Sequence, residues 1–211
     1  MAGDNFMLGI TALAVGVIHT LLGPDHYLPF VAMSQAGAWS ARKTLGVTVA
    51  CGLGHVAGSV AIGCVGLLIG AAALRLEMLE TMRGDAAAWL FMGFGLAYLV
   101  SGLMWATRHA AHENAAAATG WAPWLAFLVF AFGPCEPLIP LLLYPAATAG
   151  WGAVAMVVAA FTLATVGTMT ITVMAMRHGL AFMPAIAIGR FGHAWAGLAI
   201  LACGVLVKVG L

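Results

Sequence analysis

The sequence predicts an all-α polytopic membrane protein, and its composition and the length of its apolar segments are the two observations behind that prediction. Of its 211 residues, 64% are hydrophobic and only 7% are charged, whereas an ordinary soluble domain has roughly 25% charged residues. A bilayer core of about 30 Å needs roughly 20 apolar residues per helix. Six stretches reach that length, so we predict six transmembrane helices. They are residues 6–33, 44–74, 86–107, 121–147, 151–176 and 191–209.

The first, second and fourth spans are longer than one crossing requires, so each must tilt or break. Gly23-Pro24 lies inside the first span, and Gly133-Pro134 lies inside the fourth. Proline removes a backbone donor and clashes with the carbonyl four residues before it, which opens the helix and frees carbonyl groups. We therefore predict that these two helices are broken at their Gly-Pro pairs.

Most charged residues lie between the predicted spans, and residues 75–85 in particular are predicted as a charged connection. The loops after spans one, three and five carry five of the eight basic residues. Under the positive-inside rule these loops are cytoplasmic and both termini lie outside. The N-terminus lacks the basic region of a signal peptide, so we expect the first span to stay as a membrane helix, in a bacterial inner membrane.

Several function classes are excluded by what the chain lacks. The net charge of +1 comes with no basic patch for neutralising phosphates, so we expect no nucleic-acid partner. No P-loop motif and no hydrolytic constellation occur, and we do not expect an enzyme. The lipid bilayer is the one partner that composition itself indicates.

The two halves of the chain resemble each other. Gly23-Pro24-Asp25-His26 is echoed 110 residues later by Gly133-Pro134-Cys135-Glu136, and His55 stands at the same offset from Thr165. Because each half has three spans, the halves would insert with opposite orientations and form an inverted repeat. In that architecture broken helices at the repeat interface hold the substrate. The predicted halves of this single transmembrane domain, residues 1–211, are residues 6–107 and 121–209.

His19, Asp25 and His26 lie inside the first span, where ionisable groups cost several kcal/mol unless they find partners. On an unbroken helix the two histidines would share a face but stand about 10.5 Å apart along the axis, too far for one ion. The break at Gly23-Pro24 can bring them closer. Imidazole and carboxylate together favour a divalent metal ion. The alternative is a polar cluster that pins the kink, with Asp25 capping the half-helix.

Further candidates lie in other spans. His55 follows glycines that let another helix approach, so it is a candidate fourth ligand or a histidine hydrogen-bonded across a helix interface. Cys135 and Glu136 could bind a soft metal transiently, and Glu136 could carry protons, but a buried thiol is also an ordinary packing group. Thr165 and Thr168 either line a polar path or bond to carbonyls of their own helix.

The segment His19-Thr-Leu-Leu-Gly-Pro-Asp-His26 resembles the first-span signature of the nickel/cobalt transporter superfamily. Five residues separate the histidine from the aspartate, as in the accessory permeases of urease and hydrogenase maturation, whereas the larger permeases have four. A second family motif, Leu-Gly-His, is matched by Leu53-Gly54-His55. The resemblance covers two of six spans and implies transport of Ni2+ or Co2+ through His19, Asp25, His26 and His55. It also implies metallochaperones or maturation proteins as partners, and no permanently bound cofactor.

Gly133-Pro134-Cys135 resembles a motif of the thiol-disulfide electron carriers of cytochrome c maturation, which have six spans and an inverted repeat. Those carriers need a cysteine in each half, and here Asp25-His26 stands where the first would be. The likeness therefore indicates shared architecture rather than shared function.

Three functions follow from these residues. The first is a permease that carries a divalent metal through a midplane His/Asp site by alternating access. The second is a membrane electron carrier that uses Cys135. The third is an exporter of an anion or a sulfur compound from the same broad superfamily, which would hold the anion at half-helix N-termini. The carboxylates of Asp25 and Glu136 disfavour this function by charge repulsion.

Overall fold

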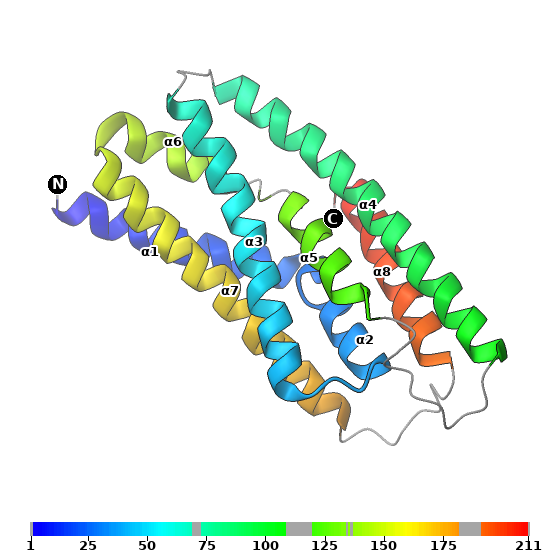
Figure 1. Ribbon diagram of the computed structural model, residues 1–211. Coiled ribbons are helices and arrows are strands. Elements are labelled where there is room, and N and C mark those ends of the chain that lie inside the picture. Colours follow the sequence, from blue (N-terminus) through cyan, green and yellow to red (C-terminus); the bar gives the residue numbers. More distant parts are fainter. Residues whose placement is uncertain are drawn as a thin grey trace.

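In the computed structural model every regular element is a helix, which confirms the all-α class for the residues that the structure describes, 2–68, 73–108, 120–133, 135, 137–181 and 191–210 (Figure 1). The elements are α1 (Ala2–Leu22), the 3-10 helix η1 (Pro24–His26), α2 (Leu28–Ala36), α3 (Ala41–Leu68), α4 (Ala73–Arg108), α5 (Ala122–Phe132), α6 (Leu138–Thr148), α7 (Trp151–Ala181) and α8 (Gly192–Lys208).

The first predicted span is broken at its Gly-Pro pair, as the sequence predicts. α1 ends at Leu22, and Pro24 opens η1, a position at which a missing N–H costs no hydrogen bond. The fourth predicted span is also interrupted, because α5 ends at Phe132 and α6 begins at Leu138. Pro134 and Glu136 lie outside the described residues.

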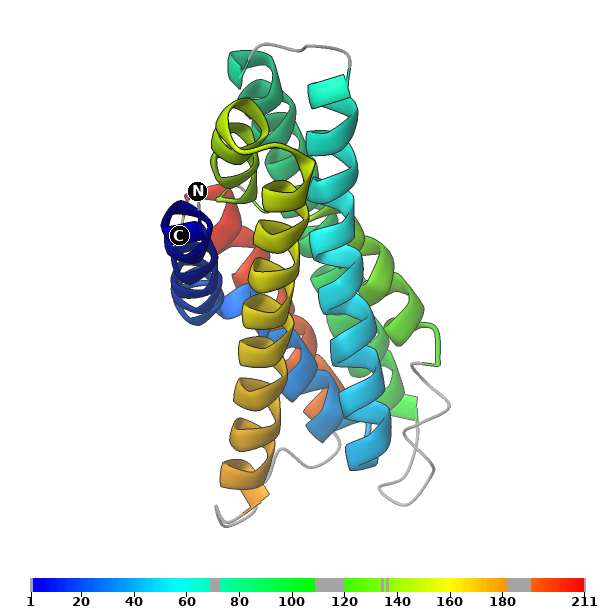
Figure 2. The same ribbon diagram turned by 90° about the vertical axis from the view of Figure 1, so that its left-hand side faces the viewer.

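Four helices are long and apolar enough to cross a membrane: residues Asn5–Leu22 of α1, Ala41–Gly66 of α3, Met78–Thr107 of α4 and Trp151–Gly179 of α7. α5, α6 and α8 are shorter apolar helices of 10–17 residues. Figure 2 shows α3 and α7 side by side, with α1 crossing the outer side of α7.

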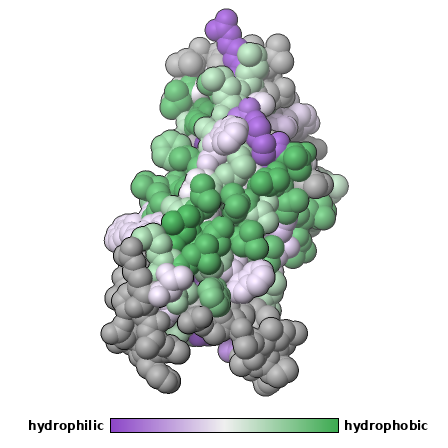
Figure 3. Space-filling view, turned by 90° about the vertical axis from the view of Figure 1, so that its right-hand side faces the viewer, coloured by the Kyte–Doolittle hydropathy of each residue, from purple (hydrophilic) through white to green (hydrophobic). Residues whose placement is uncertain are grey.

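Exposed hydrophobic side chains gather on the outside of the molecule. On the face shown in Figure 3 they form a continuous band, with hydrophilic residues above it. Trp89 and Leu96 of α4 and Leu163 of α7 are each more than half exposed. Large contiguous apolar surfaces of this kind are rare on soluble monomers and suit contact with lipid.

The prediction that residues 75–85 form a connection was wrong. α4 begins at Ala73, so this charged segment is helical. Its Ala, Leu, Glu, Met and Arg residues are strong helix formers, and Glu80 pairs with Arg83 one turn later at 2.9 Å. Hydropathy marks the segment as polar, but helix propensity decides its backbone.

α4 and α8 pack against each other, antiparallel, at glycines. A Cβ on Gly95 would collide with the backbone of Leu201, and a Cβ on Gly197 would collide with the backbone of Leu99. Gly102 and Gly204 meet the partner helix in the same way, at Ala194 and Met92. Small residues permit such close approach, which is how helices associate where there is no water to drive them together.

Aromatic rings join α2, α4 and α5 beside the broken helices. Phe30, Phe91 and Phe130 are buried, and the ring centroid of Phe130 lies 4.5 Å from that of Phe30 and 5.2 Å from that of Phe91. Aromatic pairs at such separations contribute about 0.5–1.5 kcal/mol each beyond their burial. They fix the end of α5 next to the segment that follows the first break.

We expect Gly197→Ala to lower the free energy of unfolding by about 1–3 kcal/mol, because the new methyl group must push the α4 backbone away. Gly93→Ala on α4 is the matched control, since a Cβ there meets no atom within 4 Å. The measurement is unfolding of the purified protein in detergent, followed by circular dichroism. Equal midpoints for the two variants would contradict the packing argument.

Candidate metal centre

The break after α1 folds His26 back toward His19. The two ring centroids lie 4.8 Å apart, so the approach that the sequence predicts across the Gly-Pro pair is confirmed. Gly23 makes this reversal feasible. A Cβ at Gly23 would lie 2.6 Å from Nδ1 of His26 and 2.8 Å from Oδ1 of Asp25, so any larger residue would displace both side chains.

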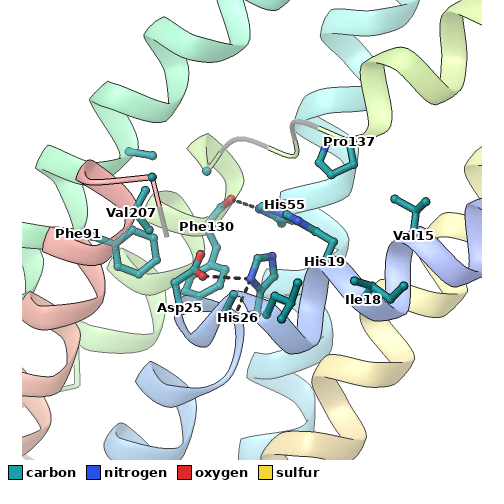
Figure 4. Close-up of a pocket in the computed structure, with 15 residues that line it drawn as sticks. Val15, Ile18, His19, Asp25, His26, His55, Phe91, Phe130, Pro137 and Val207 are labelled. Carbon is teal, nitrogen blue, oxygen red and sulfur yellow. Dashed lines mark hydrogen bonds and ion pairs between the residues drawn. The ribbon is translucent and has the colours of Figure 1, made fainter.

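His55 joins the pair from the middle of α3, as Figure 4 shows. Its ring centroid lies 5.0 Å from that of His26 and 6.4 Å from that of His19. One ring nitrogen from each of the three histidines lies within 4.8 Å of the others. His26 and His55 are each 3% exposed. Three imidazoles, two of them almost wholly buried, therefore converge on one point.

Hydrogen bonds fix the tautomer of each buried imidazole. Nδ1 of His26 lies 3.2 Å from the carbonyl of Gly23 and 3.2 Å from Oδ1 of Asp25. Nδ1 of His55 lies 3.4 Å from the carbonyl of Phe130. All three partners are acceptors, so each Nδ1 carries the proton, and in the neutral ring each Nε2 holds a lone pair. Both Nε2 atoms are buried without a hydrogen-bond partner among the described residues.

Asp25 lies behind His26 and outside the group of converging nitrogens. The sequence predicts it as a direct ligand, but in the structure its carboxylate accepts from the far nitrogen of His26. A carboxylate in this position orients a metal-binding imidazole and makes it a stronger donor.

A cavity of about 450 Å³ adjoins the histidines. It is large enough for an ion that keeps six water molecules, which occupy about 180 Å³ in liquid water. His19, Asp25, His26 and His55 line it on one side, and Ala87, Phe91 and Val207 line it from α4 and α8 (Figure 4).

The structure brings one further predicted residue to the histidines and leaves two away from them. Cys135 is fully buried between α5 and α6, and its Sγ lies 4.0 Å from Nε2 of His19. Thr165 is buried on α7 facing α1, where its Oγ1 would lie 3.3 Å from a Cβ on Gly16. Neither Thr165 nor Thr168 is among the residues that line the cavity. Glu136 lies outside the described residues.

Sequence reasoning missed the role of Arg83, which binds the broken end of α5. Its Nε donates to the carbonyl of Phe132 at 3.0 Å, and its Nη2 donates to the carbonyl of Ala131 at 2.9 Å. Its Nη1 donates to Ser59 of α3 and to Glu80. The carbonyl one residue earlier in the same helix, that of Phe130, is the partner of His55. Arg83 and His55 therefore hold consecutive carbonyls.

The sequence does contain a signal for this contact. A break at Gly133-Pro134 must free carbonyl groups just before it, and arginine offers five donors in a fixed geometry. Hydropathy hides the signal, because it places Arg83 in a connection between spans and away from any helix end.

Comparisons of the chain with protein-family models, with curated proteins and with solved structures find no match in any of the three.

We expect Arg83→Met to lower the free energy of unfolding by about 3–5 kcal/mol, because it leaves the Glu80 carboxylate, 3% exposed, without its cation. Lys208→Met is the matched control. It breaks the ion pair with Asp85, whose carboxylate is 60% exposed, and should cost no more than about 1 kcal/mol. Unfolding in detergent measures both, and equal losses would contradict the role given to Arg83.

Proposed function

We propose that this chain carries a divalent transition-metal cation, Ni2+ or Co2+, across a bilayer through a site formed by His19, His26 and His55. The observation that supports it most is the convergence of three imidazole nitrogens within 4.8 Å. The Nε2 atoms of His26 and His55 are also buried without a hydrogen-bond partner among the described residues. In a tetrahedral complex, histidine nitrogens about 2.0–2.1 Å from the ion lie about 3.4 Å from one another. The widest pair has to approach by only about 1.4 Å to reach that separation.

The ligand type narrows the substrate class. Neutral imidazole suits nickel, cobalt, copper, zinc and iron, whereas magnesium and calcium prefer oxygen donors. Affinity alone would favour copper over the other divalent ions, so selectivity must come from geometry and metal supply. The likeness of the His19 to His26 segment to nickel/cobalt permeases favours nickel or cobalt, delivered or received by metallochaperones or by urease or hydrogenase maturation proteins.

Release of the ion is helped by acid, because an imidazole that takes up a proton can no longer coordinate. Metal affinity should therefore fall as pH falls. In this mechanism the affinity of the site for the ion is moderate, since an ion held too firmly would not leave.

The architecture proposed for this transport is two inverted halves, α1 to α4 and α5 to α8, each counting as three membrane crossings. Reciprocal packing supports it: α1 packs on α7 while α5 packs on α3, and α2 contacts α7 while α6 contacts α3. α4 and α8, the last helix of each half, share a pattern as well. Gly95, Leu99 and Gly102 in α4 have the same spacing as Gly197, Leu201 and Gly204 in α8.

The orientation proposed is the bacterial inner-membrane one in which both termini lie outside. The end of α2, the end of α4 and the end of α7 lie at one end of the molecule in Figure 1. Arg42, Lys43 and Arg177 are at that end, and a cluster of basic residues favours the cytoplasmic side. Alternating access then consists of one half rocking against the other around the histidines.

We expect His26→Ala to reduce uptake of Ni2+ and Co2+ into proteoliposomes by at least about tenfold, the lower end of the effect of disturbing a metal site. His178→Ala is the control, because His178 is exposed near the end of α7. Zinc and manganese are tested alongside. Unchanged flux of every ion in His26→Ala would overturn the proposed site, and loss of function only in Cys135→Ser would favour the electron-carrier alternative.

Asp25 provides a graded test of the support behind His26. Asp25→Ala removes the acceptor of the His26 Nδ1 proton, and we expect metal affinity to fall by about 10–100-fold. Asp25→Asn keeps an acceptor oxygen but loses the charge, so the affinity of this variant for Ni2+ should lie between those of the wild type and Asp25→Ala. Titration calorimetry of the purified protein with Ni2+ measures the series. Asp85→Asn, at an exposed position on α4, should bind as the wild type does, and no loss in Asp25→Ala would refute this role.

A further inference from the structure

The thiol of Cys135 approaches the histidines from the other half of the chain. His19, His26 and His55 all belong to α1, η1 and α3, whereas Cys135 lies in the interruption between α5 and α6. Its side chain is fully buried, and its Sγ is 4.0 Å from Nε2 of His19. Cys135 is a reduced thiol, as are the other three cysteines of the chain.

We propose that Cys135 is the fourth ligand of the metal site, which then has three nitrogens and one sulfur around the ion. The proposal rests on the proposed function, because it needs the three histidines to bind the same ion. It narrows the substrate class to borderline or soft cations that accept tetrahedral sites, such as Co2+, Zn2+ and Ni2+, and it excludes Mn2+ and Mg2+ as efficient substrates.

The distance fits this role. With metal–sulfur and metal–nitrogen bonds of about 2.3 Å and 2.0–2.1 Å, a tetrahedral ion places the two donor atoms about 3.6 Å apart. The 4.0 Å separation of Sγ and the His19 nitrogen therefore needs a movement of only about 0.4 Å. A simple S–H to nitrogen hydrogen bond is the competing explanation of the contact.

A second, independent observation comes from the buried nitrogens. Nε2 of His26 and Nε2 of His55 belong to side chains that are 3% exposed, and neither has a hydrogen-bond partner among the described residues. Each of the three histidines offers one ring nitrogen to a group whose members lie within 4.8 Å of one another, and Cys135 contacts His19 of that group. The thiol of Cys135 thus lies next to the place where the ring nitrogens of the three histidines converge.

Charge balance favours a thiolate over a fourth neutral ligand. Three neutral imidazoles would leave both charges of a divalent ion uncompensated in a region that solvates ions poorly. The thiolate of Cys135 cancels one charge, and the carboxylate of Asp25, bonded to His26, cancels the other. Glu80 and Arg83 already neutralise each other, so neither has to balance the ion.

The binding step is not a redox reaction. The S–H bond of Cys135 breaks, a sulfur–metal bond forms, and the proton leaves through the cavity beside the histidines. No electrons are transferred, and the metal keeps its charge. Because the sulfur comes from the second half and the nitrogens from the first, a bound ion joins the two halves, and its departure requires the sulfur–metal bond to break.

The test is the absorption spectrum of the full-length protein in detergent with Co2+, under a reductant that contains no thiol. We expect tetrahedral cobalt bands in the visible and a sulfur-to-cobalt charge-transfer band in the near ultraviolet. Cys135→Ser should lose the ultraviolet band and bind Co2+ more weakly by more than about tenfold. Cys51→Ser, which changes a buried cysteine in the aromatic core, should keep the band.

The outcomes separate this inference from the proposed function. Cobalt bound by the wild type without the ultraviolet band, and lost in His26→Ala, would retain the histidine site and overturn the role of Cys135. Persistence of the band in Cys135→Ser would overturn that role as well. No cobalt binding by the wild type would overturn both proposals. Cys135→Ala, checked for folding by circular dichroism, should match Cys135→Ser and guards against serine acting as an oxygen ligand.

Discussion

The last carbonyl groups of an α-helix lack partners within the helix, and at the end of α5 hydrocarbon offers them no water. The side chains that donate hydrogen bonds to these carbonyls determine the geometry around the site. Arg83 donates to the carbonyls of Ala131 and Phe132, and the carbonyl of Phe130 accepts from the N–H of Gly133 and from His55. The bond from His55 also fixes its tautomer, so a backbone carbonyl of the second half determines which ring nitrogen of His55 carries the proton.

The break after α1 also occurs at a Gly-Pro pair, but it reverses the chain. There the chain reverses at Gly23, and the imidazole of His26 packs over a position where no side chain fits. Asp25 then accepts from His26 in the same short turn. One break therefore supplies donor atoms, while the other supplies the restraint on His55 and the thiol of Cys135. The unequal chemistry of two similar breaks gives the centre its asymmetry.

Sequence patterns predicted local features well and long-range ones poorly. Proline and glycine act on their own backbone, so both helix interruptions were predictable, as was the approach of His19 and His26. The backbone of residues 75–85 was not, because hydropathy reports solvent preference while helix propensity decides the fold of a charged segment. For that reason the contact of Arg83 with α5 was not predicted. Asp25 was predicted as a metal ligand, because its place next to His26 in the sequence does not show that its carboxylate bonds to that imidazole.

The sequence by itself determined the all-helical membrane character, the two breaks and the kinds of donor available, since these depend on composition and on residues within a few positions of each other. Only the tertiary structure decided which donors meet. His55 reaches the first break from α3, and Cys135 reaches His19 across 116 residues. Such contacts depend on how whole helices pack, and the register of that packing is set by many small contacts, such as those between the glycines of α4 and α8, which no short segment encodes.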